Sequence, residues 1–208
     1  PQSAGTDRGV YNGLGAAERG LGMKTLETAR LLLTPWREED AEALYALASD
    51  PDIGPMCGWE PHRSVEDSRR IIRDVFSAPE VCAILSRESG TLLGAVGLQP
   101  PSEMFPELPA TRQRELGYWL GRAYWGHGIM PEAVQALLRY GFGELKLEAV
   151  WCSHYDWNRQ SRRVIEKCGF RYQFTKKTTN VMNATHETVF YALKREEWDS
   201  LHGKKEFV

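Results

Sequence analysis

The stretch Tyr124-Trp125-Gly126-His127-Gly128-Ile129-Met130-Pro131-Glu132-Ala133, or YWGHGIMPEA, decides how this chain is interpreted. Two glycines, Gly126 and Gly128, stand just before a helical pattern whose apolar residues recur at positions 129, 133, 136, 137 and 140. The start of a helix leaves about four backbone N–H groups without partners, and the aligned peptide dipoles add partial positive charge there. Glycines let the backbone adopt positive φ and approach a ligand closely. The stretch therefore predicts an anion site, best suited to phosphate, made by the N–H groups of residues 126–130.

Two glycines by themselves are also typical of an ordinary strand-to-helix turn. The pattern is not a GxxxxGK[ST] phosphate loop, because no Lys-Ser/Thr pair follows, and Ile129-Met130-Pro131 breaks the GxGxxG pattern. If the loop binds phosphate, the ligand is expected to lie outside the nucleoside triphosphates and dinucleotides.

Size and charge exclude several classes of function. With 208 residues the chain is expected to form one domain, and its formal net charge of −2 shows no basic footprint for nucleic acid. No apolar run approaches the roughly 20 residues that a membrane span needs. The cysteines lack CxxC spacing and neighbouring histidine pairs, which argues against a metal site and a disulfide framework and predicts reduced thiols in a cytoplasmic protein. These cysteines are Cys57, Cys82, Cys152 and Cys168.

Residues 1–22 differ from the rest in being rich in Gly, Ala and Ser, without an apolar period or a signal-peptide core. We expect them to be a disordered leader or a tail added by cloning, with Met23 as the natural start. Residues 23–201 are expected to form the domain, and residues 202–208 a C-terminal tail.

Apolar periodicity predicts an α+β fold with a mixed sheet and helices on its faces. The βαβ unit around the helix over 129–142 implies one parallel strand pair, and the hairpins on either side imply antiparallel pairing. Residues 100–112, which contain four prolines, are expected to form a loop. The seven expected strands cover 29–36, 81–87, 92–98, 115–120, 147–154, 170–177 and 187–193, and the other expected helices cover 38–48, 64–76 and 158–168.

A second polar cluster begins at Asn158-Arg159-Gln160-Ser161. Asn158 is well placed to cap the following helix, which is a structural role that needs no ligand. Ser161 shares a helix face with Ile165 and Cys168, so its hydroxyl is either a satisfied buried group or one that serves a ligand.

These patterns together identify residues 23–201 as similar to the GNAT acyl-CoA N-acetyltransferases, most closely to the branch that contains the RimJ/RimL-type ribosomal-protein N-acetyltransferases. The order and spacing of four stretches carry the resemblance and are far more specific than any one of them. The stretches are Leu26-Glu27-Thr28-Ala29-Arg30-Leu31-Leu32-Leu33, Glu115-Leu116-Gly117-Tyr118-Trp119-Leu120, Tyr124 through Ala133, and Asn158-Arg159-Gln160-Ser161 through Glu166-Lys167-Cys168-Gly169-Phe170.

The resemblance implies a mostly antiparallel seven-stranded sheet whose fourth and fifth strands are parallel and splay apart around acetyl-CoA. The backbone at Trp119 and Leu120 and the side chain of Asn158 would contact the pantetheine arm, with Ser161 beside it. The phosphate loop of the family falls on Trp125, Gly126, His127, Gly128, Ile129 and Met130. Trp125 and Met130 depart from the usual Gln/Arg and Gly/Ala, which places a larger side chain near the pyrophosphate. His127 would add a donor to a phosphate or stay a solvent-exposed loop residue.

The implied reaction is attack of a primary amine on the thioester, with CoA as product. Much of the family uses a helix tyrosine to protonate the departing thiolate, but Ile165 occupies that position here, so Ser161 is the expected acid and a water the alternative. Glu115 is the expected base, although an exposed carboxylate at the end of a strand is also common without any catalytic role. His62 is a second base candidate, and Tyr118, on the opposite face of its strand, is expected in the core.

The sequence does not identify the acceptor, which can be a protein N-terminus or a small-molecule amine. A homodimer is expected only because the resemblance to this branch of the family implies it. A non-catalytic acyl-CoA-binding module on the same fold is the main alternative, because fold does not dictate function. A domain that binds a phosphosugar or nucleotide at the same helix start is a third.

Overall fold

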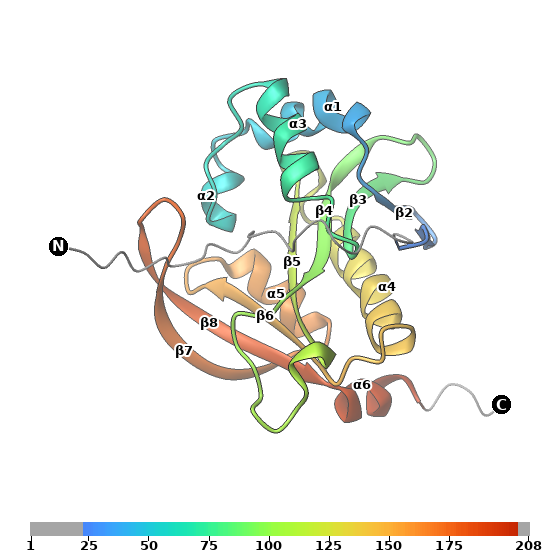
Figure 1. The fold of residues 1–208 in the computed structure, drawn as a ribbon, viewed down its shortest axis with the longest axis vertical. Coiled ribbons are helices and arrows are strands. Elements are labelled where there is room, and N and C mark those ends of the chain that lie inside the picture. The colour runs from blue at the N-terminus through green and yellow to red at the C-terminus, as the bar shows by residue number, and fades with distance from the viewer. Residues whose placement is uncertain (1–22, 204–208) are drawn as a thin grey trace.

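A single eight-stranded sheet runs through residues 23–203, the part of the chain that the computed structural model describes (Figure 1). The order across the sheet is β1-β2-β3-β4-β5-β6-β8-β7. Neighbouring strands are antiparallel except for β5 and β6, which are parallel. The strands are β1 (Leu26–Glu27), β2 (Leu31–Pro35), β3 (Val81–Ser86), β4 (Leu92–Gln99), β5 (Gln113–Leu120), β6 (Ala149–Tyr155), β7 (Arg171–Thr179) and β8 (Thr185–Lys194).

Helices cover both faces of this sheet. One face carries α4, which packs on β4 and β2 and against α5, while α1 and α3 pack together on the other face (Figure 1). The helices are α1 (Ala41–Ala48), α2 (Gly54–Cys57), α3 (Val65–Asp74), α4 (Ile129–Gly143), α5 (Arg159–Lys167) and α6 (Arg195–His202), and short 3₁₀ turns span Glu38–Asp40, Ala110–Arg112 and Arg122–Tyr124.

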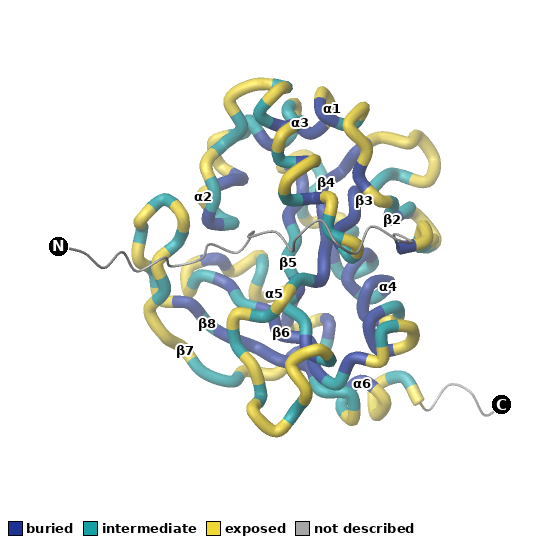
Figure 2. Tube along the Cα trace, in the orientation of Figure 1, coloured by how far each residue is buried: buried dark blue, intermediate teal, exposed yellow. Residues whose placement is uncertain are grey.

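The central strands are buried on both sides because helices lie above and below them. The first four residues of β3 and the first seven of β4 are buried, and Figure 2 shows dark blue along both strands and much of α4. Strands covered on both faces are expected to be continuously apolar, as LLGAVGL in β4 is. At the sheet edge β7 is largely exposed.

The two faces of β5 belong to different cores. Leu116 and Leu120 pack with α4, whereas Trp119 packs with α1 and α3. This follows from the period of two along a strand. A residue on β5 therefore faces either the α4 and α5 side or the α1 and α3 side, which decides its neighbours in the site below.

The mixed α+β fold and the single parallel pair confirm the sequence-based prediction. The expectation of seven strands was wrong by one, because Leu26 and Glu27 fold back across the turn at residues 28–30 and pair with Leu33 and Leu32. A two-residue strand has too short an alternation to be detected from sequence.

Two helices were also missed. Four residues are too few to show a helical period in α2, whereas α6 has a sequence signal in Glu197, whose carboxylate accepts a hydrogen bond of 2.8 Å from the backbone N–H of Lys194. Trp198 of α6 stacks on Phe142 with 5.2 Å between ring centroids. The expected leader at residues 1–22 and most of the expected tail at 202–208 lie outside the described residues.

Candidate functional site

The parallel strands β5 and β6 separate partway along their length. They pair at Gln113–Ala149, Arg114–Val150 and Glu115–Trp151, after which each strand continues along its other neighbour alone. β5 stays paired with β4 as far as Leu120, and β6 stays paired with β8 as far as Tyr155. The separation opens the sheet at its centre and leaves backbone groups of both strands facing a gap.

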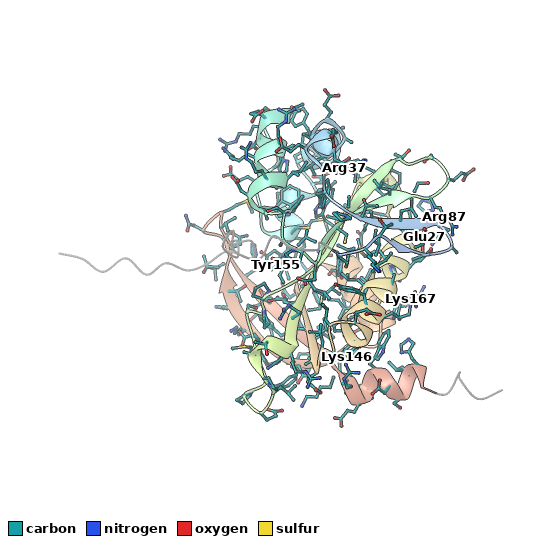
Figure 3. The ribbon with its side chains drawn as sticks, turned by 45° about the vertical axis from the view of Figure 1, so that its right-hand side comes forward. Glu27, Arg37, Arg87, Lys146, Tyr155 and Lys167 are labelled. Atoms are coloured by element: carbon teal, nitrogen blue, oxygen red, sulfur yellow. The ribbon has the colours of Figure 1, made fainter. Side chains whose placement is uncertain are left out.

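A large cleft fills this gap and encloses about 1900 Å³. Ligand pockets are typically about 300–1,000 Å³, so this cleft has room for two molecules side by side. Its walls come from β5 and β6, the start of α4, α5, the segment before α3, and the β7–β8 hairpin. Tyr155, labelled in Figure 3, lies at the end of β6 on this cleft.

The glycine loop borders the cleft just before α4. Gly126 has φ +81° and Gly128 has φ +73°, conformations that side-chain-bearing residues rarely adopt. A Cβ placed at Gly126 would have no atom within 4 Å, so the backbone there is open to a ligand. Ile129 and Met130, the first residues of α4, also line the cleft, and N–H groups in the first turn of a helix have no partner within the helix.

Met130 lies differently from what its sequence position suggested, whereas His127 takes the second of its two expected positions. The side chain of Met130 is 4% exposed and packs in the core with α4, so its size adds little bulk at the loop. His127 is exposed and is not among the residues that line the cleft. Trp125 lines the cleft, and its indole N–H donates a 2.9 Å hydrogen bond to the Leu120 carbonyl, which closes the turn between β5 and the loop.

An ion pair from the β1–β2 turn holds this loop in place. The Arg30 Nε donates to Glu132 Oε2 at 2.7 Å, and Arg30 Nη1 donates to the His127 carbonyl at 3.0 Å. Thr28 Oγ1 donates to the other carboxylate oxygen of Glu132 at 2.6 Å. Burial of Glu132 opposes ionisation, but the hydrogen bonds from Thr28 and Arg30 outweigh it and hold the pKa of this carboxyl below its usual value. These contacts were not predicted from sequence, because they join residues about a hundred positions apart.

Glu115 belongs to the last residue pair before β5 and β6 separate, a point that we call the fork. Its Oε2 accepts a 2.8 Å hydrogen bond from the Ser102 backbone N–H, and its Oε1 accepts a longer one of 3.4 Å from Ser153 Oγ. Ser102 belongs to the loop between β4 and β5, which Gln113 anchors by accepting from Phe105 N at 2.9 Å. The carboxylate is therefore fixed in position and lines the cleft.

Asn158 and Ser161 form the other side of the cleft at the start of α5. Asn158 is 8% exposed, and its Oδ1 accepts a 3.1 Å hydrogen bond from the Ser161 N–H, which is the capping role expected from sequence. The Ser161 Oγ lies 2.8 Å from Tyr118 Oη. Tyr118 packs against the core as expected, but sequence reasoning missed this hydroxyl pair.

His62 lines the cleft from the segment before α3. Its Nδ1 lies 2.8 Å from Ser68 Oγ, and its ring lies 5.4 Å from that of Trp59. Burial lowers the pKa of His62, although the Asp67 carboxylate acts in the opposite direction. A neutral imidazole at neutral pH can accept a proton, so His62 is still a second candidate for the base.

Residues 23–203 hold no group of three or more His, Cys, Asp or Glu side chains arranged to bind a metal ion. Over the same residues, no helix is both long and apolar enough to cross a membrane.

Comparison with known proteins gives one consistent family. A family model described as acetyltransferase (GNAT) domain matches residues 30–171. The chain is 28% identical over 182 residues to the FsC-acetyl coenzyme A-N(2)-transacetylase of Aspergillus fumigatus, covering 84% of this chain and 77% of that protein. It is 32% identical over 83 residues to the ribosomal-protein-serine acetyltransferase of Escherichia coli, covering 39% of this chain and 45% of the relative.

A solved structure agrees with these matches. The crystal structure of an acetyltransferase of the GNAT family from Bacillus anthracis superposes with a TM-score of 0.73 at 26% identity, covering 83% of this chain and 99% of the other.

Proposed function

Because the acetyltransferase model spans most of the described residues, this chain belongs to the GNAT family of acetyl-CoA-dependent acetyltransferases, and we propose that its acceptor is a primary amine. The observation that carries the proposal is the fork of β5 and β6, which opens beside the glycine loop and has a fixed carboxylate at its vertex. The proposal places the protein in the cytoplasm, which its four free cysteines support.

The residues of the cleft suit acetyl-CoA. A pantetheine arm carries amide groups that can bond to strand backbone, and β5 beyond Glu115, where its β6 side is unpaired, offers such backbone. A pyrophosphate needs N–H donors and close approach, which the open backbone at Gly126 and the start of α4 provide. The volume of about 1900 Å³ leaves room for an acceptor as well.

Bound acetyl-CoA supplies the acetyl group as a thioester: the amine nitrogen bonds to the carbonyl carbon, the C–S bond breaks with its electron pair on sulfur, and the ammonium loses two protons, one to sulfur and one to solvent. In the proposal Glu115 takes a proton from the amine at the fork. Ser161, across the cleft on α5, donates a hydrogen bond to the departing sulfur. Asn158 orients the first turn of α5, and the loop at Gly126 holds the phosphates.

The acceptor class is tested by measuring thiol release with acetyl-CoA and a panel of amines. The panel contains peptides that begin with Ser or Ala, spermidine and glucosamine, because both a protein N-terminus and a small amine agree with the chemistry of the cleft. We expect release with at least one of them. Acetyl-CoA binding without release for any amine would contradict the proposal and favour a non-catalytic module.

Variants separate catalysis from cofactor binding. Glu115→Gln should lower kcat/KM by roughly 10²–10⁴, the usual contribution of a general base, while CoA affinity stays unchanged. Glu148→Gln is the matched control, because Glu148 pairs with Arg112 at 2.9 Å outside the cleft. Equal activity of the two variants would remove Glu115 from the mechanism and leave His62 as the base to test.

A further inference from the structure

Tyr118 brings a hydroxyl group to Ser161 from the opposite wall of the cleft. Its Oη lies 2.8 Å from Ser161 Oγ and 3.3 Å from the Ser161 carbonyl oxygen. Tyr118 is on β5 and Ser161 on α5, 43 positions apart, and both residues line the cleft. Tyr118 thus supplies a phenol to a helix, α5, that carries no tyrosine of its own.

Either oxygen of the Tyr118–Ser161 hydroxyl pair can donate, and we take the arrangement in which Tyr118 is the donor. Hydrogen bonds between hydroxyl groups are typically about 2.5–3.0 Å long, so the 2.8 Å contact is a full bond and the 3.3 Å contact is weaker. When Tyr118 donates to Ser161 Oγ, the hydrogen of the serine hydroxyl is left for another acceptor. Within residues 23–203, Tyr118 is the hydrogen-bond partner that the structure gives the Ser161 hydroxyl, and the remaining direction is the cleft.

The backbone of Ser161 is also fixed, by a hydrogen bond to Asn158. Asn158 Oδ1 accepts from the Ser161 N–H at 3.1 Å, so the first turn of α5 is fixed in position. Behind Ser161 on the same helix face, Ile165 is fully buried. The Cα of Ser161 is therefore fixed by its helix, and its hydroxyl is in hydrogen-bond contact with Tyr118.

We propose that Tyr118 is a positioning residue, which donates to Ser161 Oγ and thereby directs the serine hydrogen toward the sulfur that departs during acetyl transfer. The inference rests on the proposed function. Tyr118 neither gains nor loses a proton in this role; it supplies one hydrogen bond.

The surroundings of Tyr118 suit a permanent donor. Although the residue keeps some exposure, burial of its hydroxyl end raises the pKa of the phenol well above its usual value. The nearby thiol of Cys152 also has a raised pKa because it is buried. The phenol therefore stays protonated over the pH range of any ordinary assay.

The test compares Tyr118→Phe, Ser161→Ala and the double variant, using the amine from the panel that gives the fastest thiol release. Tyr118→Phe keeps the ring and should lower kcat roughly three- to tenfold, as loss of one hydrogen bond would, with CoA affinity unchanged. In the Ser161→Ala background the same change should have no further effect, because the partner is already gone. Tyr140→Phe removes a hydroxyl from a tyrosine that packs on the same core outside the cleft, and should leave kcat unchanged.

A second measurement excludes a purely structural effect. Acetyl-seleno-CoA carries a more acidic leaving group than acetyl-CoA, and a more acidic leaving group departs with less assistance. The ratio of wild-type to Tyr118→Phe kcat should fall from three- to tenfold toward one with this donor. A ratio that is the same for both donors, or additive effects in the double variant, would overturn the proposal. A wild-type protein inactive with every amine would instead overturn the proposed function on which it rests.

Discussion

Substitution of Gly126 by alanine tests whether the glycine loop binds phosphate, once the cost of placing alanine at a positive φ has been subtracted. Alanine at a φ of +81° costs about 1–2 kcal/mol of folding free energy, and no neighbouring atom lies within 4 Å of the new Cβ to add a clash. For a chain of this size that corresponds to a melting temperature lower by about 2–8 °C.

Gly90 provides a matched control for this substitution. It has φ +70°, its Cβ would also meet no atom within 4 Å, and it lies in the β3–β4 turn, away from the cleft. Gly90→Ala should therefore show a similar loss of stability. Any difference between the two variants in the presence of CoA then reports on the ligand and not on the backbone.

The assay is a thermal melt with and without CoA at a hundred times its Kd for the wild-type protein. Binding adds about 2.7 kcal/mol to the wild-type protein and to Gly90→Ala at that concentration. The methyl group at Gly126 would hold the pyrophosphate away from the loop, and loss of one hydrogen bond to a charged oxygen is worth about 1.5 kcal/mol, or roughly tenfold in Kd. The stabilisation of Gly126→Ala by CoA should then be about 1.4 kcal/mol. Equal stabilisation of both variants would refute the assignment of this loop to phosphate.

Two further predictions concern the surroundings of the cleft. Glu132→Gln weakens the contacts with Thr28 and Arg30 and should lower the free energy of unfolding by about 1–2 kcal/mol, measured by urea denaturation; an unchanged value would show that the ion pair does not hold the loop. Burial lowers the pKa of His62, so below about pH 6.5 the unfolded chain binds a proton that the folded chain does not, and stability should fall as pH drops through that window. His62→Gln should flatten this fall between about pH 7.5 and about pH 5 in the same denaturation experiment, and an unaltered slope would assign it to other groups.

The sequence alone determined the features that depend on neighbours along the chain. Apolar periods located β2 to β8 and the helices α1, α3, α4 and α5, and the two glycines before an amphipathic helix predicted an anion site at the loop before α4. The positive φ values of Gly126 and Gly128 have the local cause that was expected of them. The helix cap at Asn158 was also predicted from sequence, because it joins residues only three positions apart.

Contacts between distant segments could not be predicted in this way. The period of two correctly placed Tyr118 on the core face of its strand, but nothing in that period indicates that its hydroxyl would reach Ser161. The contacts from Thr28 and Arg30 to Glu132 likewise join a turn and a helix that only the folded sheet brings together.

The same distinction holds for the cleft as a whole. Side chains of β5 and β6 indicate that both are strands, but nothing in them indicates that their pairing ends at Glu115, after which each strand continues with its outer neighbour alone. Local sequence thus predicted the candidate site residues and the elements on which they stand. The tertiary structure decided which of them face one another, because hydroxyl and carboxylate contacts act over about 3 Å and depend on the packing of the whole sheet.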